Sequence, residues 1–188
     1  MNSKTKKLVG VGMFAAVVVV LQLLGGGIKF GMFSISLVLI PIVVGAAVYG
    51  WQAGAILGGV FGTAVLLSGD AASFMTIDPA GTIVVVLLKG VACGFFSGLV
   101  YKYLSRKNRV IAVFTSAVIC PVVNTGVFLL GCYVFFMDTI SEWAVGLGFD
   151  NAVTYMFIGL AGVNFLVELG VNLLLAPMIV RLIKLKLK

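Results

Sequence analysis

Residues 35–67 read ISLVLIPIVVGAAVYGWQAGAILGGVFGTAVLL, a stretch of 33 residues without a single charge. As one helix it would be about 50 Å long, whereas the hydrocarbon core of a bilayer is about 30 Å thick. The stretch therefore predicts a hairpin of two short spans, Ile35–Val48 and Gln52–Leu67, with its turn at Tyr49-Gly50-Trp51-Gln52. Aromatic residues such as Tyr49 and Trp51 are typical of the membrane interface, which fits a turn there.

Four further apolar segments predict spans at Leu8–Leu24, Thr82–Leu104, Val110–Met137 and Ala152–Ile183. The last is overlong, which predicts a tilted helix or one that extends beyond the bilayer. A hydrophobic fraction of 62% with 10% charged residues excludes an ordinary soluble domain. We therefore predict an all-α integral membrane protein in which residues 1–188 form one domain of six transmembrane helices.

The charged residues lie almost entirely between these spans and are sorted by sign. Basic residues gather at the N-terminus, in the 102–109 loop and at the C-terminus: Lys4, Lys6, Lys7, Lys102, Arg106, Lys107, Arg109, Arg181, Lys184, Lys186 and Lys188. Acidic residues occupy the two other long loops: Asp70, Asp78, Asp138, Glu142 and Asp150. Since Lys and Arg are retained on the cytoplasmic side, we expect both termini there. The basic 102–109 loop lies on the same side as the N-terminus only if residues 35–67 cross the membrane twice, as a hairpin does.

Several function classes do not fit this composition. The basic clusters are short and lie beside the membrane, where anionic lipid head groups account for them, so we expect no nucleic-acid partner. With no histidine, and with Cys93, Cys120 and Cys132 at no ligand spacing, we expect no metal site and interpret the cysteines as packing residues. No nucleophile motif, acid pair or phosphate loop points to an enzyme.

Small residues recur every fourth position in two spans. They are Gly50, Gly54, Gly58 and Gly62 in one, and Gly90, Gly94 and Gly98 in the other. Small residues let helix backbones approach closely in a membrane, so these stripes favour internal helix packing over a partner contact. A shorter pair, Gly12 and Ala16, lies on the first span.

Two charged residues, Lys89 and Glu168, lie well inside the predicted spans, away from the span ends. Each costs about 2.5–3.5 kcal/mol if it faces lipid, so both should face the bundle interior. Asn164 and Asn172 share one helix face with Glu168, and Asn124 follows Pro121 at similar depth. Two interpretations stay open: a buried pair that fixes the bundle, or a group of side chains that holds a polar solute.

The whole chain resembles an S component, the substrate-binding membrane subunit of energy-coupling factor (ECF) vitamin transporters. The likeness rests on the six spans, the basic termini and the Gly12/Ala16 pair. It also rests on three segments: Phe33-Ser34-Ile35-Ser36-Leu37, Cys120-Pro121-Val122-Val123-Asn124-Thr125-Gly126, and Asn164-Phe165-Leu166-Val167-Glu168 with Asn172 and Pro177.

The resemblance implies a vitamin-like solute bound near the outer face of the plasma membrane. Carried onto this sequence, it implies pocket residues Lys89, Asn124, Asn164 and Glu168, with Asp78, Trp143 and Tyr155 in the outer loops or at the rim. Lys89 would pair with a carboxylate or phosphate, Glu168 would accept from an amine, amide or ring N–H, and an aromatic rim residue would stack on a ring.

The resemblance also implies partners. Gly12 and Ala16 would dock on a transmembrane coupling subunit, in place of the Ala-xxx-Ala motif of the family. Two cytoplasmic ATPase subunits would use ATP, so this chain itself needs no cofactor. The main alternative is a stand-alone secondary transporter or channel for a small polar solute. A membrane enzyme and a purely structural or assembly protein are further alternatives.

Overall fold

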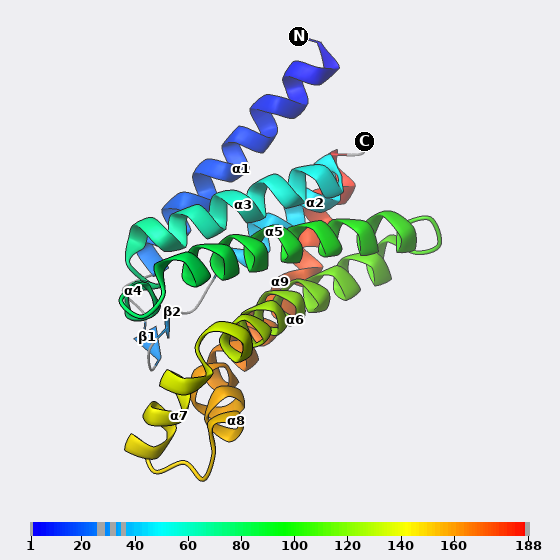
Figure 1. The fold of residues 1–188 in the computed structure, drawn as a ribbon. Coiled ribbons are helices and arrows are strands. Elements are labelled where there is room, and N and C mark those ends of the chain that lie inside the picture. The colour runs from blue at the N-terminus through cyan, green and yellow to red at the C-terminus, as the bar shows by residue number, and fades with distance from the viewer. Residues whose placement is uncertain (1, 26–28, 31–32, 35–36, 187–188) are drawn as a thin grey trace.

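The computed structural model describes residues 2–25, 29–30, 33–34 and 37–186, which fold mostly into helices (Figure 1). The order is α1 (Ser3–Gly25), β1 (Lys29–Phe30), β2 (Phe33–Ser34), α2 (Leu39–Tyr49), α3 (Trp51–Ser68), α4 (Ala72–Met75), α5 (Pro79–Leu104), α6 (Arg109–Phe135), α7 (Met137–Gly146), α8 (Ala152–Thr154), the π-helix η1 (Tyr155–Leu160) and α9 (Gly162–Lys186). The strands form a two-residue antiparallel ladder that pairs Lys29 with Ser34 and Phe30 with Phe33. Ile35 and Lys188, which the sequence analysis names, lie outside the described residues.

Five helical segments in the described ranges are long and apolar enough to cross a membrane: Lys4–Gly25, Trp51–Ser68, Pro79–Leu104, Arg109–Phe135 and Ala152–Arg181. These correspond to five of the six predicted spans. The predicted second span appears as α2, which has 11 residues. A helix of that length is about 16 Å long, so α2 alone does not cross a core of about 30 Å. The structure thus supports five spans and leaves the sixth unconfirmed.

The predicted hairpin turn is present. Gly50 separates α2 from α3 with φ of 95°, a backbone conformation that glycine adopts without the steric penalty other residues meet. The overlong last span also departs from a regular helix. Its first part is α8 followed by η1, so π-helical hydrogen bonding precedes the N-terminal end of α9.

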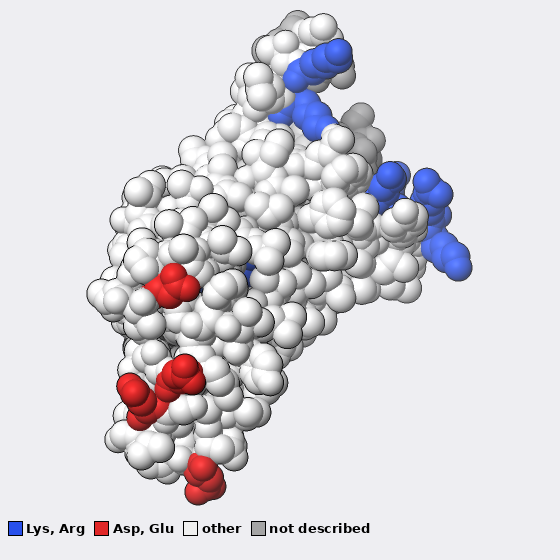
Figure 2. Space-filling model, in the orientation of Figure 1, with Lys and Arg blue, Asp and Glu red and all other residues white. Residues whose placement is uncertain are grey.

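Charge is distributed along the long axis of the molecule. In Figure 2, the basic side chains gather at the end where the N-terminus and the α5–α6 connection lie in Figure 1. The acidic side chains lie toward the opposite end, which holds α4, α7 and α8. The predicted sorting by sign is therefore a property of the folded chain, and we call these the basic and acidic ends.

The glycine stripes join α3 to α5. A Cβ on Gly58 would overlap the carbonyl oxygen of Gly90, and a Cβ on Gly94 would overlap that of Gly54. Any larger residue there would have to push one backbone away from the other. The structure therefore assigns Gly54, Gly58, Gly90 and Gly94 to packing within the bundle, whereas nothing lies within 4 Å of a Cβ built on Gly50.

Two hydrophobic clusters stabilise the fold. The larger one joins α1, α2, α3, α5, α6 and α9, with Leu39, Leu57 and Phe61 fully buried. The smaller one lies at the acidic end and packs α7, α8 and η1 against Phe74 and Phe136. Polar side chains meet where these two clusters adjoin.

Candidate functional site

A cavity with about 770 Å³ of empty space, part of it open to solvent, lies in the acidic half of the bundle. Its lining comes from α1, α3, the α3–α4 turn, α4, α5, α6, η1 and α9. The lining residues are Gln22, Val65, Asp70, Ala71, Phe74, Thr82, Val85, Val86, Lys89, Asn124, Thr125, Phe128, Phe136, Leu160, Ala161, Asn164, Phe165 and Glu168.

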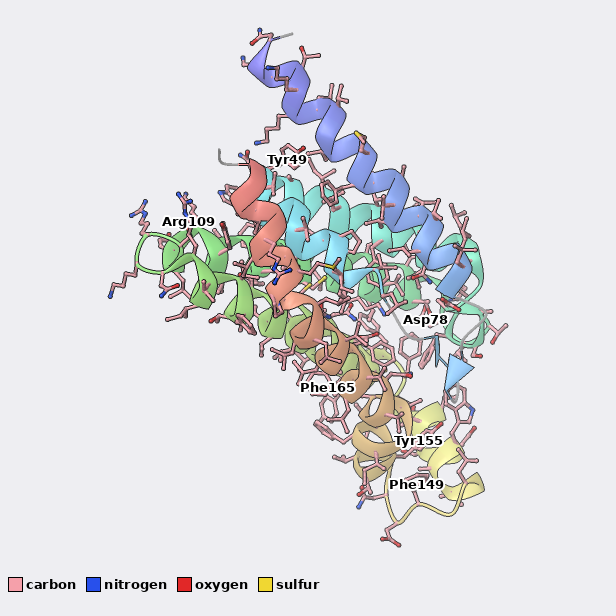
Figure 3. All side chains as sticks on the ribbon, turned by 180° about the vertical axis from the view of Figure 1, so that it is seen from behind. Tyr49, Asp78, Arg109, Phe149, Tyr155 and Phe165 are labelled. Carbon is pink, nitrogen blue, oxygen red and sulfur yellow. The ribbon has the colours of Figure 1, made fainter. Side chains whose placement is uncertain are left out.

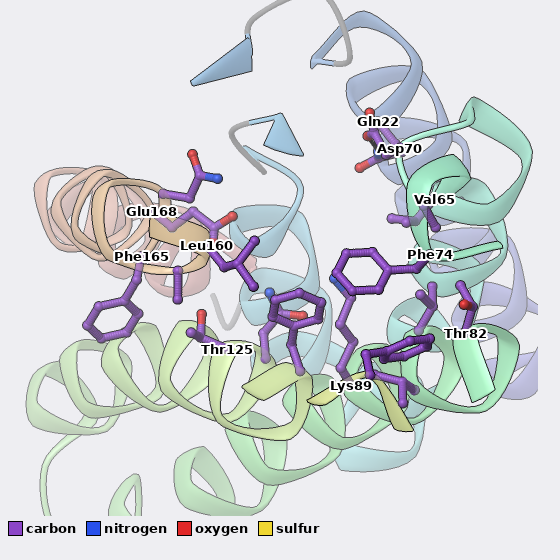
Figure 4. Close-up of a pocket in the computed structure, with 18 residues that line it drawn as sticks. Gln22, Val65, Asp70, Phe74, Thr82, Lys89, Thr125, Leu160, Phe165 and Glu168 are labelled. Atoms are coloured by element: carbon purple, nitrogen blue, oxygen red, sulfur yellow. Dashed lines mark hydrogen bonds between the residues drawn. The ribbon is translucent and has the colours of Figure 1, made fainter. Parts of the chain in front are cut away.

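Lys89 reaches into the cavity from α5 (Figure 4). Its ammonium nitrogen lies 5.2 Å from the centre of the Phe128 ring and 5.9 Å from that of Phe61. An ammonium group over the face of an aromatic ring is attracted by the electron-rich face. Lys89 thus faces the interior of the bundle, as the sequence predicted.

The wall formed by α6 and α9 carries three of the predicted residues. Glu168 is 6% exposed and Asn124 is 5% exposed, and both line the cavity together with Asn164. The side-chain oxygens of Asn124 and Asn164 are buried without a hydrogen-bond partner among the described residues. Such groups favour a partner that brings hydrogen-bond donors, since a buried unpaired acceptor costs about 1–3 kcal/mol. Asn172 does not line the cavity; its amide donates to the carbonyl oxygen of Glu168.

The opposite side contains residues that the sequence analysis missed. Gln22 of α1 is 2% exposed, and its amide donates to the carboxylate of Asp70 and, at 3.4 Å, to the hydroxyl of Ser68. Gln22 and Asp70 both line the cavity, so one end of α1 is bonded to its wall. The signal in the sequence that would have pointed to Gln22 is a lone glutamine inside an apolar span.

Aromatic rings close the acidic end of the cavity. Phe74 packs edge-on against Phe128, Phe136 and Trp143, with ring centres 5.8, 4.9 and 5.6 Å apart. Phe74, Phe128 and Phe136 line the cavity, whereas Trp143 lies behind Phe74. Trp143 therefore supports the aromatic wall through Phe74.

The structure does not bring Tyr155 or Asp78 into the lining. Tyr155 is buried in η1 and packs against Phe149, with ring centres 5.1 Å apart; both lie at the acidic end in Figure 3. Asp78 precedes α5 and accepts a hydrogen bond of 3.1 Å from the backbone N–H of Ala80. Asp78 is thus the N-cap of α5.

We expect Asp78→Ala to lower the free energy of unfolding by about 1 kcal/mol, since a lost N-cap costs roughly that much. Solute affinity should change less than twofold, because the side chain lies outside the lining. Thermal unfolding in detergent and a binding titration measure the two effects, and Asp78→Asn, which keeps the cap, is the matched control. A large loss of affinity at unchanged stability would instead place Asp78 at the rim of the site.

Gly12 and Ala16, the predicted docking pair, lie on an exposed face of α1. Nothing lies within 4 Å of a Cβ built on Gly12, while Gly10 faces inward against Tyr49. Large apolar side chains of α1 extend the exposed face, including Leu8 (73% exposed) and Met13 (68% exposed). Among the five candidate spans, α1 is the least buried.

The structure is that of a helical bundle with apolar spans and an interior cavity that contains charged and amide side chains, the architecture of a polytopic membrane protein. Within the described residues, no group of three His, Cys, Asp or Glu side chains is placed to hold a metal ion. The family model for the ECF transporter substrate-specific component matches residues 6–180, nearly the whole chain. The chain therefore belongs to this family, whose members are substrate-binding transporter subunits and not enzymes. Searches of the curated proteins and of the solved structures found no match.

Membership makes the chain a multi-pass membrane protein that binds a small molecule and works with ECF coupling and ATPase subunits. The predicted resemblance is confirmed, and with it the predicted class of function.

Proposed function

We propose that this chain binds a vitamin or related micronutrient in the cavity between α5, α6 and α9 and delivers it to an ATP-driven importer. The observation that carries the proposal is the meeting of Lys89, Asn124, Asn164 and Glu168 in one cavity of a bundle whose helices are largely apolar. Buried ionisable groups in membrane spans are expensive, which favours a functional role for them. The basic end would face the cytoplasm and the cavity the outside of the plasma membrane.

In this proposal α1 is the docking helix. Its face around Gly12 and Ala16 has no cover within the described chain and allows close approach of another helix. The ATPase subunits would hydrolyse ATP, and this chain would carry no cofactor of its own.

The experiment that tests the proposal is identification of the solute. The chain is purified alone in mild detergent, extracted under denaturing conditions for mass spectrometry, and screened by thermal shift against the water-soluble vitamins and their precursors. A ligand at a hundredfold excess over Kd raises apparent stability by about 2.7 kcal/mol, so a true solute is readily detected. If no compound binds, the micronutrient proposal fails, and the substrate of this subunit belongs to another class of small molecule.

Once a solute is known, we expect Asn124→Ala and Glu168→Gln each to weaken its binding roughly 5- to 150-fold. This range corresponds to the 1–3 kcal/mol lost when one partner of a buried hydrogen bond is removed. Isothermal titration calorimetry measures the affinity, and circular dichroism checks that the helices persist.

Asn108→Ala is the matched control, since Asn108 caps α6 at the basic end through hydrogen bonds of 2.8 and 3.2 Å from Val110 and Ile111. That variant should lose about 1 kcal/mol of stability and keep its affinity. If Asn124→Ala and Glu168→Gln instead destabilise the bundle while the remaining folded protein binds normally, these residues serve the fold and the site assignment is wrong.

A further inference from the structure

The spacing of buried residues changes where the last span passes from η1 into α9. The first buried pair of η1, Tyr155 and Met156, is followed five residues later by a second pair, Leu160 and Ala161. Beyond this point the spacing falls to four, and Asn164 is the next residue of the span that lines the cavity. One residue more than a regular helix uses therefore separates the two pairs.

A regular α-helix does not keep residues five apart on one face. It turns by about 100° per residue, so five residues advance about 140° beyond a full turn. The backbone of η1 removes this offset, because the N–H of Ala161 donates to the carbonyl oxygen of Met156, five residues earlier, at 3.1 Å. The α-helical pattern resumes with the N–H of Phe165, which donates to the carbonyl oxygen of Ala161, four residues earlier, at 2.8 Å. The π-helical turn thus takes up the extra residue and keeps both pairs on one face.

The two buried pairs serve different parts of the cavity. The first pair belongs to the smaller hydrophobic cluster, which also contains Phe74 and Phe136 of the aromatic wall. The second pair lines the cavity directly. Since α9 also packs against α6 and α2, its position does not depend on the smaller cluster. The turn in η1 is therefore what relates the aromatic wall to the polar residues of α9.

Gly162 permits the close approach that this turn requires. A Cβ built on Gly162 would lie 2.9 Å from the carbonyl oxygen of Phe157, five residues earlier. Because this oxygen belongs to the backbone, a larger residue at position 162 has to displace the turn itself. Gly159, inside η1, is covered in a similar way by the ring of Tyr155, which a Cβ there would overlap.

We propose that η1 positions the aromatic wall of the solute site. It keeps the first buried pair packed in one cluster with Phe74 and Phe136, while the same helix presents the second pair and Asn164 to the cavity. Without the extra residue, the first pair would turn by about 100° out of the cluster. The inference rests on the proposed function, since it concerns the same cavity. Short π-helical turns occur frequently at functional sites, which fits this role.

The first test removes the extra residue without removing a contact to the solute. Ile158 is 61% exposed and does not line the cavity, so its deletion only shortens the interval between the two buried pairs from five residues to four. We expect the deletion to weaken binding of the solute identified by extraction by about tenfold or more, comparable to the loss of one aromatic contact. Ile158→Ala, which keeps the chain length, is the matched control and should bind as wild type does. Unchanged affinity in a folded deletion variant overturns the inference.

A pair of double variants separates positioning from a general loss of stability. If η1 acts through the aromatic wall, Phe74→Leu should weaken binding in wild type and add less than about twofold in the deletion variant. Asn124→Ala, on the opposite wall, should weaken both backgrounds by the same factor. Losses that multiply for Phe74→Leu as well would show that η1 does not act through this ring, and the inference would be wrong.

Trp143 provides a readout that needs no solute, because its ring lies 5.6 Å from that of Phe74. The chain has two tryptophans, so Trp51→Phe leaves Trp143 as the sole one. In that background, deletion of Ile158 should shift the emission to longer wavelength and raise quenching by acrylamide, whereas Ile158→Ala should change neither. An unchanged spectrum overturns the inference. Failure of the vitamin screen removes the proposed function and leaves this measurement to decide the role of η1.

Gly162→Ala replaces the deletion if the shortened chain does not fold. It should lower solute affinity about tenfold and change the Trp143 emission in the same direction, since it displaces the same turn. Gly170→Ala is its control, because nothing lies within 4 Å of a Cβ at that position of α9. Equal affinity and equal emission in the two alanine variants would contradict a positioning role for η1.

Discussion

We expect Gly58→Leu to abolish the folded protein and Gly58→Ala to lower its free energy of unfolding by about 1–3 kcal/mol. A Cβ at this position overlaps the carbonyl oxygen of Gly90, which belongs to the backbone of α5 and cannot rotate away. Overpacking of that kind typically costs 1–3 kcal/mol for a small side chain and more for a larger one. Thermal unfolding in detergent, followed by fluorescence-detected size-exclusion chromatography, measures the loss.

The adjacent residue provides a matched control. A Cβ on Gly59 would lie 3.5 Å from Cγ2 of Val91, an ordinary van der Waals distance. Gly59→Ala should therefore be neutral or stabilising, because alanine is favoured over glycine in a helix interior by up to about 1 kcal/mol. If both alanine variants unfold at the same temperature, the close contact of α3 with α5 is not what holds these helices together.

The sequence predicted helix boundaries well where apolar runs end at charged or turn residues, and less well elsewhere. The α5 and α6 boundaries fall close to the predicted ones, since long apolar runs bounded by charges leave little choice. The helix α3 begins directly after Gly50, within the predicted turn. The predicted span Ile35–Val48 appears as the shorter helix α2, Leu39–Tyr49. Apolar composition at 37–38 does not distinguish a helix from the segment that leads into it, because burial against neighbouring helices decides between them. The π-helical start of the last span likewise had no signal in hydropathy.

The sequence predicted the charged and amide residues that α5, α6 and α9 contribute to the candidate site. It did not predict the residues of α1 and of the α3–α4 turn that complete the cavity wall. Lys89 and Glu168 stand out because a charge within an apolar span must face the interior, and the structure brings both to one cavity. Gln22 and Asp70 were missed, since they meet only when α1 packs beside the α3–α4 turn. The resemblance implied that Asp78 lies in an outer loop or at the rim, whereas its place one residue before Pro79 fits a helix N-cap equally well. Local chemistry names candidates, and only long-range packing selects among them.

We expect Gly12→Leu to abolish ATP-driven uptake while solute binding to the isolated chain stays within twofold of wild type. Gly12 has open space around its Cβ position, so the substitution leaves the bundle intact and adds a side chain to the outer face of α1. If a partner helix packs closely there, the added bulk costs about 1–3 kcal/mol, or roughly 5- to 150-fold in association. Uptake by cells and co-purification of the coupling subunit measure the effect.

Two further variants, Gly170→Leu and Gly10→Leu, distinguish a loss of docking from a loss of stability. Gly170→Leu also adds bulk where nothing lies within 4 Å of the Cβ position, but on α9, and it should leave uptake unchanged. Gly10→Leu would overlap the Tyr49 ring, so it should lower the stability of the bundle itself. Full uptake by Gly12→Leu would mean that this face of α1 is covered by lipid and not by a partner.

Loss of uptake in both Gly12→Leu and Gly170→Leu would indicate that transport is sensitive to added bulk anywhere on the lipid-facing surface. The exposed face of α1 is tied to transport only if Gly12→Leu alone loses uptake while its solute binding is preserved. That result would separate the solute cavity at the acidic end from a docking surface nearer the basic end.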